Sequence, residues 1–311
     1  MRSIFARFRL GLVLGGGGAR GGAHAGVLSI LSDIGYQPDL IVGASMGALV
    51  ASLAGTGLPP SKIIQILLEA RFTDLISVDR TGRGLVGSDR IESFLKRHLG
   101  GADLRDLKPK VAVMATDLLG REAVILDEGP AVRAVLASMA IPGLFPLVEW
   151  GGRELVDGGL LTNVPTQAAY QLGAERLVAV DVGGGNWSTD VTLNNIGNFN
   201  AQLQRALYWL LSLSKREAAF ETWLRSAMLT NDKLSEYHLQ LFPPDILIQP
   251  AMPKIGLFTM EFLEDAIRAG VEAALALAPE IRKLANRWYH LRRPATPAGR
   301  LALLPSKQLS D

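Results

Sequence analysis

Strand-like and helix-like segments alternate along most of this 311-residue chain. Runs of strand length that are rich in apolar residues occur at residues 10–14, 40–42, 110–115, 122–126, 148–150, 154–156, 176–182 and 246–248. Segments with a helical pattern lie between them, at residues 23–34, 48–54, 61–70, 89–95, 131–137 and 165–172, and a longer helix begins at residue 259. Because helices regularly separate the strands, the pattern predicts an α/β fold in which a mostly parallel central sheet carries helices on both faces.

A single α/β domain is predicted over residues 10–290. Residues 1–9 form a basic lead-in. The prolines and polar residues of the segment 291–311 predict a loose tail. Residues 71–88 contain several glycines and no clean period, which indicates a loop or a mobile flap. Residues 194–245 predict a helical segment that covers the sheet.

The predicted covering segment carries an apolar stripe at helical spacing, formed by Leu203, Leu207, Leu210 and Leu211 and accompanied by Trp209 and Trp223. One interpretation is a helix whose apolar stripe is buried against the sheet. The other is a lipid-facing lid, since an amphipathic helix with tryptophan can lie in the headgroup layer of a membrane. The sequence leaves both interpretations open.

Composition restricts the available chemistry. Hydrophobic residues make up 48% of the chain and charged residues 20%, which is typical of a globular protein rather than a disordered one. The chain has no cysteine, so disulfides, thiol catalysis and cysteine metal sites are excluded. Its four histidines include no H-x-x-x-H pair, so we expect neither a metal nor another cofactor.

Charge and hydropathy bear on the partners and the location of the protein. A net charge of +2 and a pI near 8.9 are too balanced to indicate a nucleic-acid partner, although a mildly basic face can approach anionic lipid. No run reaches the length of a membrane span. The apolar run after the basic start breaks at Gly15, before any cleavage site. We therefore expect a cytoplasmic protein that is soluble or peripheral at the inner face of the membrane.

A loop packed with glycine follows the first predicted strand and has the sequence Gly15-Gly16-Gly17-Gly18-Ala19-Arg20-Gly21-Gly22. With so few side chains, its backbone N–H groups can point at one spot, and the next helix N-terminus adds positive potential. Such a site suits a phosphate or the oxyanion of an acyl transfer. The loop also fits G-x-G-x-x-G, but Asp39, the acid nearest the spacing of a dinucleotide site, precedes the second strand instead of ending it. We therefore expect no nucleotide partner.

The second predicted strand runs into Gly43-Ala44-Ser45-Met46-Gly47, which fits the G-x-S-x-G pattern of a nucleophile elbow. In this motif a serine occupies a sharp, strained turn between a strand and a helix. Side chains at the two flanking glycines would collide with neighbouring backbone. Taken by itself, the pattern fits either a nucleophilic Ser45 or a tight turn with a buried serine.

A serine nucleophile needs a base to take its proton. His238 and His290 come late enough in the chain for the order serine, acid, histidine, but neither follows a predicted strand. His24 stands one turn after the glycine loop, where it could orient that loop. Packing or helix-end roles are expected for these three residues and for His98.

Three aspartates near predicted strand ends are the other candidate bases: Asp117, Asp157 and Asp181. Asp157 differs from the other two because Gly158 and Gly159 follow it. Such a tight turn can press the carboxylate against another loop, where partial burial raises its pKa toward that of a useful base. An aspartate that forms an Asx-turn with its own backbone is the alternative interpretation.

Taken together, three motifs resemble the patatin-like phospholipase family, in particular its short bacterial members that are similar to the catalytic domain of neuropathy target esterase. The motifs are Gly16-Gly17-Gly18-Ala19-Arg20-Gly21, Gly43-Ala44-Ser45-Met46-Gly47 and Asp157-Gly158-Gly159. Residues 116–118 and 137–146 support the resemblance, which covers roughly residues 10–182.

The resemblance implies a Ser–Asp dyad without histidine, in which Ser45 is the nucleophile and Asp157 the general base. It also implies that amides of the glycine loop form the oxyanion hole and that Asp117 and Ser138 are neighbours of the site. The expected reaction is hydrolysis of an acyl ester of a phospholipid or lysophospholipid, without a metal. Arg20 would hold the loop, meet a lipid phosphate, or form a salt bridge with a nearby acid.

Two other functions are compatible with the same fold. The first is a lipid-binding or partner-binding regulator with little turnover. The second is an acyltransferase, which would form the same acyl-enzyme and pass the acyl group to another alcohol or to a thiol.

Overall fold

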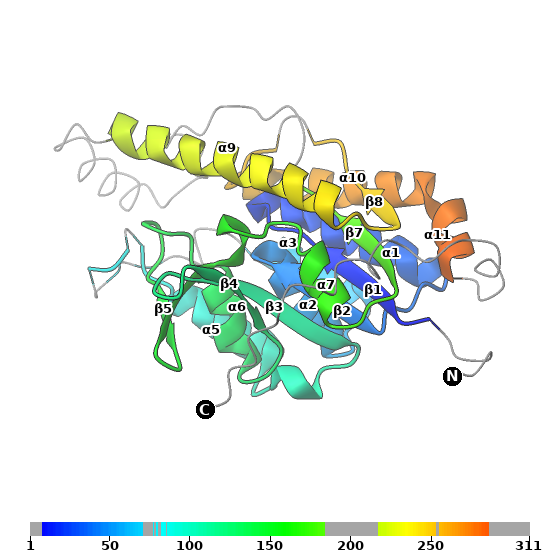
Figure 1. Cartoon of the computed structure of the whole chain (residues 1–311), viewed down its shortest axis with the longest axis horizontal. Helices are drawn as coiled ribbons and strands as arrows, with labels where there is room; N and C mark the ends of the chain where they lie inside the picture. Colours follow the sequence, from blue (N-terminus) through cyan, green and yellow to red (C-terminus); the bar gives the residue numbers. More distant parts are fainter. Residues whose placement is uncertain are drawn as a thin grey trace.

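The computed structural model describes residues 8–70, 77, 79, 82–84, 86–183, 217–252 and 255–285 (Figure 1). Within them, eight strands form one sheet in the order β5-β6-β3-β2-β1-β7-β8, and β4 pairs with β3 outside this path. The strands are β1 (Leu10–Leu14), β2 (Leu40–Ala44), β3 (Lys110–Asp117), β4 (Glu122–Leu126), β5 (Val148–Trp150), β6 (Arg153–Asp157), β7 (Arg176–Val180) and β8 (Ile246–Ile248).

The central part of the sheet is parallel and one end is antiparallel. Strands β8, β7, β1, β2 and β3 pair in parallel, whereas β4, β6 and β5 are antiparallel to their neighbours. Parallel strands need crossover connections, and the helices provide them. The predicted mostly parallel sheet is therefore confirmed.

Helices cover both faces of the sheet, as predicted. One face packs against helices α1 (Gly22–Asp33), α2 (Met46–Gly55), α3 (Pro60–Glu69), α5 (Asp89–Leu99), α6 (Ala131–Ser138), α10 (Leu263–Ala276) and α11 (Ala278–Ala285). The other face packs against α7 (Thr166–Gln171) and the end of α9 (Glu217–Leu241). Short 3-10 turns occur at Gly18–Gly21, Leu104–Asp106, Gly158–Leu160 and Met260–Phe262. Figure 1 shows α9, in yellow, as a long helix that crosses the molecule.

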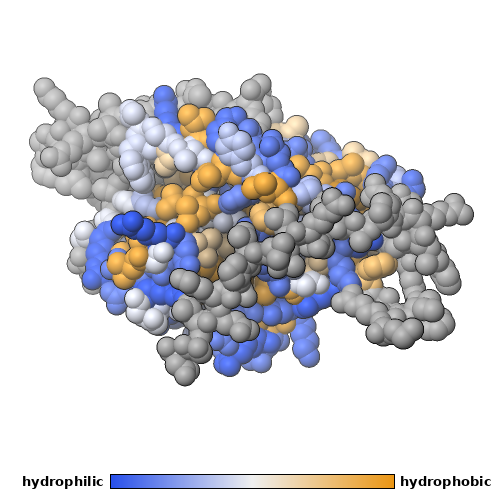
Figure 2. Space-filling model, in the orientation of Figure 1, coloured by the Kyte–Doolittle hydropathy of each residue, from blue (hydrophilic) through white to orange (hydrophobic). Residues whose placement is uncertain are grey.

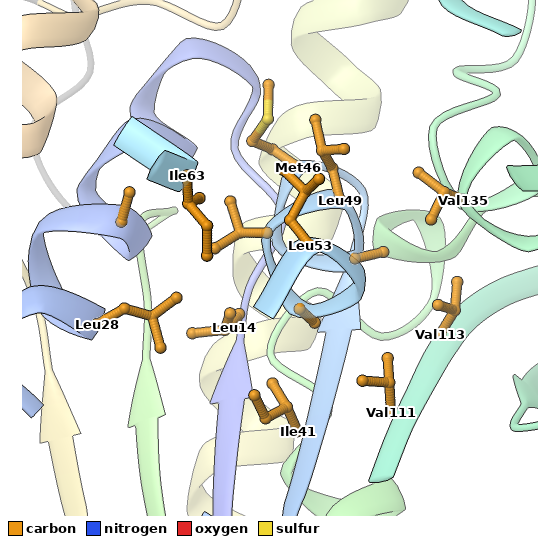
Figure 3. Packing of buried hydrophobic residues seen from close by; sticks show 14 of the residues in the cluster. Leu14, Leu28, Ile41, Met46, Leu49, Leu53, Ile63, Val111, Val113 and Val135 are labelled. Carbon is orange, nitrogen blue, oxygen red and sulfur yellow. The ribbon is translucent and has the colours of Figure 1, made fainter. Parts of the chain in front are cut away.

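The alternation of side chains along the strands explains the two cores. On β1, Leu12 and Leu14 belong to the cluster beneath α2, while Val13 belongs to the cluster beneath α7. Both sides of these strands are apolar because both are covered. Figure 3 shows the cluster beneath α2, in which Leu49 and Leu53 of the helix lie over strand residues.

The strand that leads to Ser45 and the strand that ends in Asp157 meet on one edge of β3. Strand β4 pairs with residues 113–117 and occupies the other edge. On the shared edge, Ala44 of β2 pairs with Met114, and Asp157 of β6 pairs with Ala115. The two strand ends therefore point toward each other beside adjacent residues of β3.

Some sequence predictions concern residues outside the described part of the chain. They include most of the predicted flap at 71–88 and of the lead-in at 1–9, the apolar stripe with Trp209, His290 and the tail. Of the predicted covering segment at 194–245, the structure describes residues 217–245, in which α9 ends at Leu241. The domain limits at residues 10 and 290 stay predictions.

Candidate active site

Ser45 occupies a strained turn between β2 and α2. Its φ of 51° and ψ of −121° lie outside the conformations that non-glycine residues usually adopt. A Cβ on Gly43 would lie 2.4 Å from the Gly47 carbonyl oxygen, and one on Gly47 would lie 2.1 Å from the Leu14 carbonyl oxygen. The backbone leaves no room for side chains on either glycine, so the G-x-S-x-G spacing has the steric basis that the sequence suggested.

The Ser45 hydroxyl contacts the Asp157 carboxylate directly. Oγ of Ser45 donates a hydrogen bond to Oδ2 of Asp157 at 2.7 Å. The other oxygen, Oδ1, accepts a hydrogen bond from the Gly159 N–H at 2.7 Å. Burial raises the pKa of Asp157 to about 6, and the hydrogen bonds from Ser45 and Gly159 oppose that rise.

The glycines after Asp157 serve close packing against β3. A Cβ on Gly158 would lie 2.2 Å from the Met114 carbonyl oxygen, so no side chain fits there. The Thr116 hydroxyl donates to the Asp157 carbonyl oxygen at 3.1 Å and ties the turn to the same strand. The predicted Asx-turn is also present, since Asp157 accepts from the amide two positions later. The Asx-turn and the contact with Ser45 use different oxygens and therefore coexist.

The amides of the glycine loop are not all available to a ligand. The N–H of Gly16 donates to Oδ1 of Asn163 at 2.8 Å. Those of Ala19 and Arg20 donate to the carbonyl oxygens of Leu257 and Gly17. Within the described residues, the N–H groups of Gly17 and Gly18 have no recorded acceptor. The oxyanion hole at residues 16–21 stays a prediction, for which the amides of Gly16, Ala19 and Arg20 are already engaged.

Arg20 lies buried between acidic side chains. Its Nε donates to the Gly17 carbonyl oxygen at 3.4 Å. Desolvation lowers the pKa of Arg20 to about 10, while the charges of Asp232 and Asp181 oppose that effect. Burial raises the pKa of Asp232 to about 7, and Arg20 opposes that rise. The bond to Gly17 agrees with a role in holding the loop, and the charges of Asp232 and Asp181 agree with the interpretation that Arg20 pairs with a nearby acid.

The other candidate bases have different neighbours. Asp117 accepts from the Leu119 N–H, and Asp181 accepts from the Gly183 N–H and from Gln249. His24 is buried with Nε2 2.7 Å from the Gly15 carbonyl oxygen, and burial lowers its pKa to about 4. No imidazole is among the hydrogen-bond partners of Ser45 and Asp157 in the described part of the chain.

Two residues near the site make contacts that the sequence analysis did not predict; Ser138 was expected only as a neighbour of the site, and Asn163 was not singled out. Oγ of Ser138, fully buried at the end of α6, accepts a hydrogen bond from the Ser45 N–H at 2.8 Å. Asn163 accepts a hydrogen bond from the Gly16 N–H and lies four residues beyond Gly159. Ser138 lies in the segment 137–146, which supports the family resemblance, and Asn163 lies shortly after the Asp157-Gly158-Gly159 motif. Their closeness to these motifs in the sequence was the only signal that could have pointed to the two residues.

A cavity of about 230 Å³ opens over the Ser45 and Asp157 side chains. Its walls are mostly apolar and include Leu118, Ile141, Leu160 and Leu257, together with one face of α9. Gly16, Gly17 and Arg20 of the glycine loop reach the same cavity. The hydroxyl, the carboxylate and part of the glycine loop therefore border one apolar space.

The chain shares sequence with larger proteins. It is 33% identical over 178 residues to an uncharacterized NTE family protein of Mycobacterium bovis, a match that covers 57% of this chain and 49% of that protein. It is 30% identical over 200 residues to neuropathy target esterase sws of Drosophila melanogaster, covering 61% and 14%. It is 32% identical over 189 residues to lysophospholipase NTE1 of Debaryomyces hansenii, covering 58% and 12%. The chain thus spans about half the length of the mycobacterial relative and less of the others.

A solved structure and a family model are also similar to this chain. The crystal structure of VipD from Legionella pneumophila is similar with a TM-score of 0.56 at 16% identity, covering 88% of this chain and 67% of that one. At this identity the similarity concerns the fold alone. The family model for patatin-like phospholipase matches residues 12–170, about half of the chain, and includes the glycine loop, the elbow and the Asp157 turn. The chain therefore belongs to the patatin-like phospholipase family.

Proposed function

We propose that this protein is a serine lipid acyl hydrolase that cleaves carboxylic esters of phospholipids or lysophospholipids through a Ser–Asp dyad. The observation that carries the proposal is the 2.7 Å hydrogen bond from Ser45 Oγ to Asp157 Oδ2. This distance suits proton transfer between a nucleophile and its base. A pKa of about 6 for Asp157 keeps the carboxylate ionised at neutral pH and still basic enough to accept a proton.

In the first half of the reaction, Oγ of Ser45 attacks the carbonyl carbon of the ester. The hydroxyl proton moves to Oδ2 of Asp157 as the new carbon–oxygen bond forms. Asp157 then gives this proton to the leaving alcohol oxygen when the ester bond breaks. An acyl group remains on Ser45, and the carboxylate is restored.

The negative oxygen of the tetrahedral intermediate needs hydrogen-bond donors. The N–H groups of Gly17 and Gly18 are suited to this role because those of Gly16, Ala19 and Arg20 have acceptors elsewhere. The N-terminus of α2, which begins at Met46, adds positive potential at the same place. One donor of an oxyanion hole is worth about 3–4 kcal/mol of barrier.

In the second half, Asp157 takes a proton from water, and the resulting hydroxide oxygen attacks the acyl carbon. The bond to Ser45 Oγ breaks, Oγ recovers the proton from Asp157, and the free acid leaves. Each proton that Asp157 accepts is returned within the same half-reaction. No cofactor is required by this sequence of steps.

A lipid ester is the proposed substrate because the cavity beside the dyad is mostly apolar. An acyl chain gains free energy when it leaves water for such walls. The names of the relatives agree with this class, since they include an esterase and a lysophospholipase.

We also propose that the cavity mouth contacts a lipid surface. Leu118 and Trp223 line the cavity and are 42% and 43% exposed, and the adjacent Leu119 is 63% exposed. Figure 2 shows exposed apolar residues in the middle of the face that it draws. None of the helices in the described residues has the length and apolar content of a membrane span. We propose a peripheral contact.

The proposal is tested by assaying Ser45→Ala and Asp157→Asn on p-nitrophenyl esters and on lysophospholipid. Each variant should lose at least about 10³-fold in kcat, as removal of a nucleophile or its base does. Ser52→Ala is the matched control, because Ser52 is a buried serine of α2 whose Oγ has no partner among the described residues. Full hydrolysis by either active-site variant would remove that residue from the mechanism.

Two further assays separate the alternative functions. A fluorophosphonate probe should label wild-type protein at Ser45, whereas a regulator without a reactive serine should stay unlabelled. Product analysis in the presence of an acceptor alcohol distinguishes a hydrolase, which releases free acid, from an acyltransferase, which forms a new ester.

A further inference from the structure

Helix α9 forms a wall of the cavity although it lies beyond the residues matched by the family model. Four of its residues line the cavity: Trp223, Ala227, Met228 and Asn231. Their spacing places them on one face of the helix. The matched region at residues 12–170 supplies the reacting groups, and α9 supplies a surface beside them.

The two ends of this face are located by contacts. A Cβ on Gly143 would lie 3.8 Å from the Trp223 ring, and one on Gly159 would lie 3.7 Å from Nδ2 of Asn231. Asn231 therefore lies at the end of the cavity near Asp157, and Trp223 lies at the other end. With a rise of 1.5 Å per residue, about 12 Å of helix separates these two positions.

Ala227 stands midway between Trp223 and Asn231, on the same face. Leu118, Ile141 and Leu160 are among the other apolar residues around the cavity. A small side chain at position 227 leaves room that a larger one would fill. The cavity has a volume of about 230 Å³, and Ala227 lies in the part of its wall that α9 contributes.

We propose that Ala227 determines acyl-chain specificity: its small side chain gives α9 the space in which the chain of the substrate lies beside the Ser45–Asp157 pair. The inference rests on the proposed function, because it concerns the acyl group that Ser45 would attack. It adds that the wall formed by α9 limits the length of the acyl chain that the cavity accepts.

The test compares wild type with Ala227→Leu on p-nitrophenyl butyrate, hexanoate, octanoate, decanoate and dodecanoate. In wild type, kcat/KM should rise about fourfold per added methylene until the cavity is full. Leucine adds an isopropyl group to the wall, so the optimum should move to a chain shorter by about two to three carbons. The ratio of decanoate to butyrate hydrolysis should fall at least about tenfold.

Two more variants control for stability and helix packing. Ser226→Leu places the same side chain at the neighbouring exposed position, where the serine bonds only locally to the Thr222 carbonyl oxygen, and should keep the wild-type profile. Met228→Ala enlarges the cavity and should move the optimum to longer chains. Thermal unfolding of every variant identifies one that does not fold, and Met228→Ala then carries the test.

Binding provides a readout that does not depend on turnover. Isothermal titration with alkylphosphocholines from hexyl to dodecyl should show the same shift in preferred chain length between wild type and Ala227→Leu. If wild type hydrolyses no ester but the preferred chain length in binding still shifts, the proposed function is wrong and the proposed role of Ala227 is supported. If esters are hydrolysed but wild type, Ala227→Leu and Met228→Ala share one chain-length profile, the proposed role of Ala227 is wrong and the proposed function is supported.

Discussion

The backbone N–H of Ser45 donates a hydrogen bond to the hydroxyl oxygen of Ser138 at 2.8 Å. This bond links the strained turn of the elbow to the buried end of α6, 93 positions away in sequence. It gives the Ser45 amide a partner in a conformation that a serine rarely adopts. The side chain of Ser45 is left to contact Asp157.

We expect Ser138→Ala to lower kcat by about 10- to 100-fold, because a buried N–H without a partner costs about 1–3 kcal/mol and the turn can relax. KM should change little, since Ser138 does not line the cavity. Ser138→Thr keeps the hydroxyl and should recover part of the rate. Ser52→Ala, measured beside it, should be nearly silent; an equal loss in both variants would indicate general destabilisation instead of positioning.

The pH dependence of the reaction should follow the ionisation of Asp157. Burial raises the pKa of this carboxyl to about 6, and only the ionised form accepts the Ser45 proton. On a neutral p-nitrophenyl ester, kcat/KM should therefore rise with pH through a midpoint near 6 and reach a plateau above pH 7. Unfolding curves recorded over the same range separate ionisation from denaturation. A rate that is level from pH 5 to pH 8 would contradict Asp157 as the base.

The same raised pKa makes Asp157 unfavourable for stability at neutral pH. Between its ordinary value of 3.8 and about 6, the folded protein retains a proton that the unfolded chain has lost, so the free energy of unfolding falls as pH rises through this interval. The loss is on the order of 3 kcal/mol above pH 6. Asp157→Asn should therefore be more stable than wild type at pH 8.

Urea unfolding of the two proteins at pH 8 and pH 4 checks this expectation. The advantage of Asp157→Asn should shrink toward pH 4, where the wild-type carboxyl is protonated in the folded protein and no buried charge remains. An advantage that does not depend on pH would mean that packing or hydrogen bonding, and not the buried charge, distinguishes the variants.

Leu119→Glu should weaken binding to lipid vesicles several-fold, because a charge at this exposed position opposes entry into the headgroup layer. Co-sedimentation with phosphatidylcholine–phosphatidylglycerol vesicles measures the effect. Leu275→Glu is the matched control, since Leu275 is 53% exposed on α10 and does not line the cavity. Equal vesicle binding by both variants would argue against a contact at the cavity mouth.

Much of the local structure could be predicted from the sequence, because it depends on residues near one another in the chain. Apolar periodicity gave the strands and helices of the described core, and the elbow required glycine for a steric reason that the contacts of Gly43 and Gly47 confirm. The α/β fold followed from the alternation of these elements.

The choice among Asp117, Asp157 and Asp181 illustrates what sequence patterns leave open. All three stand near strand ends, and each is buried. Asp157 reaches Ser45 because β6 runs antiparallel along the same edge of β3 as β2, so that both strand ends meet there. Strand order and register arise from long-range pairing, which a local pattern does not encode.

The sequence by itself determined the parts of the site: a glycine loop, a serine in a cramped turn and an aspartate before two glycines. Only the tertiary structure decided how they combine, namely which loop amides are engaged, which residue holds the Ser45 N–H, and which face of α9 lines the cavity. The physical reason is that backbone strain and periodicity are properties of neighbouring residues, whereas hydrogen-bond partners and cavity walls come from segments that meet only when the sheet assembles.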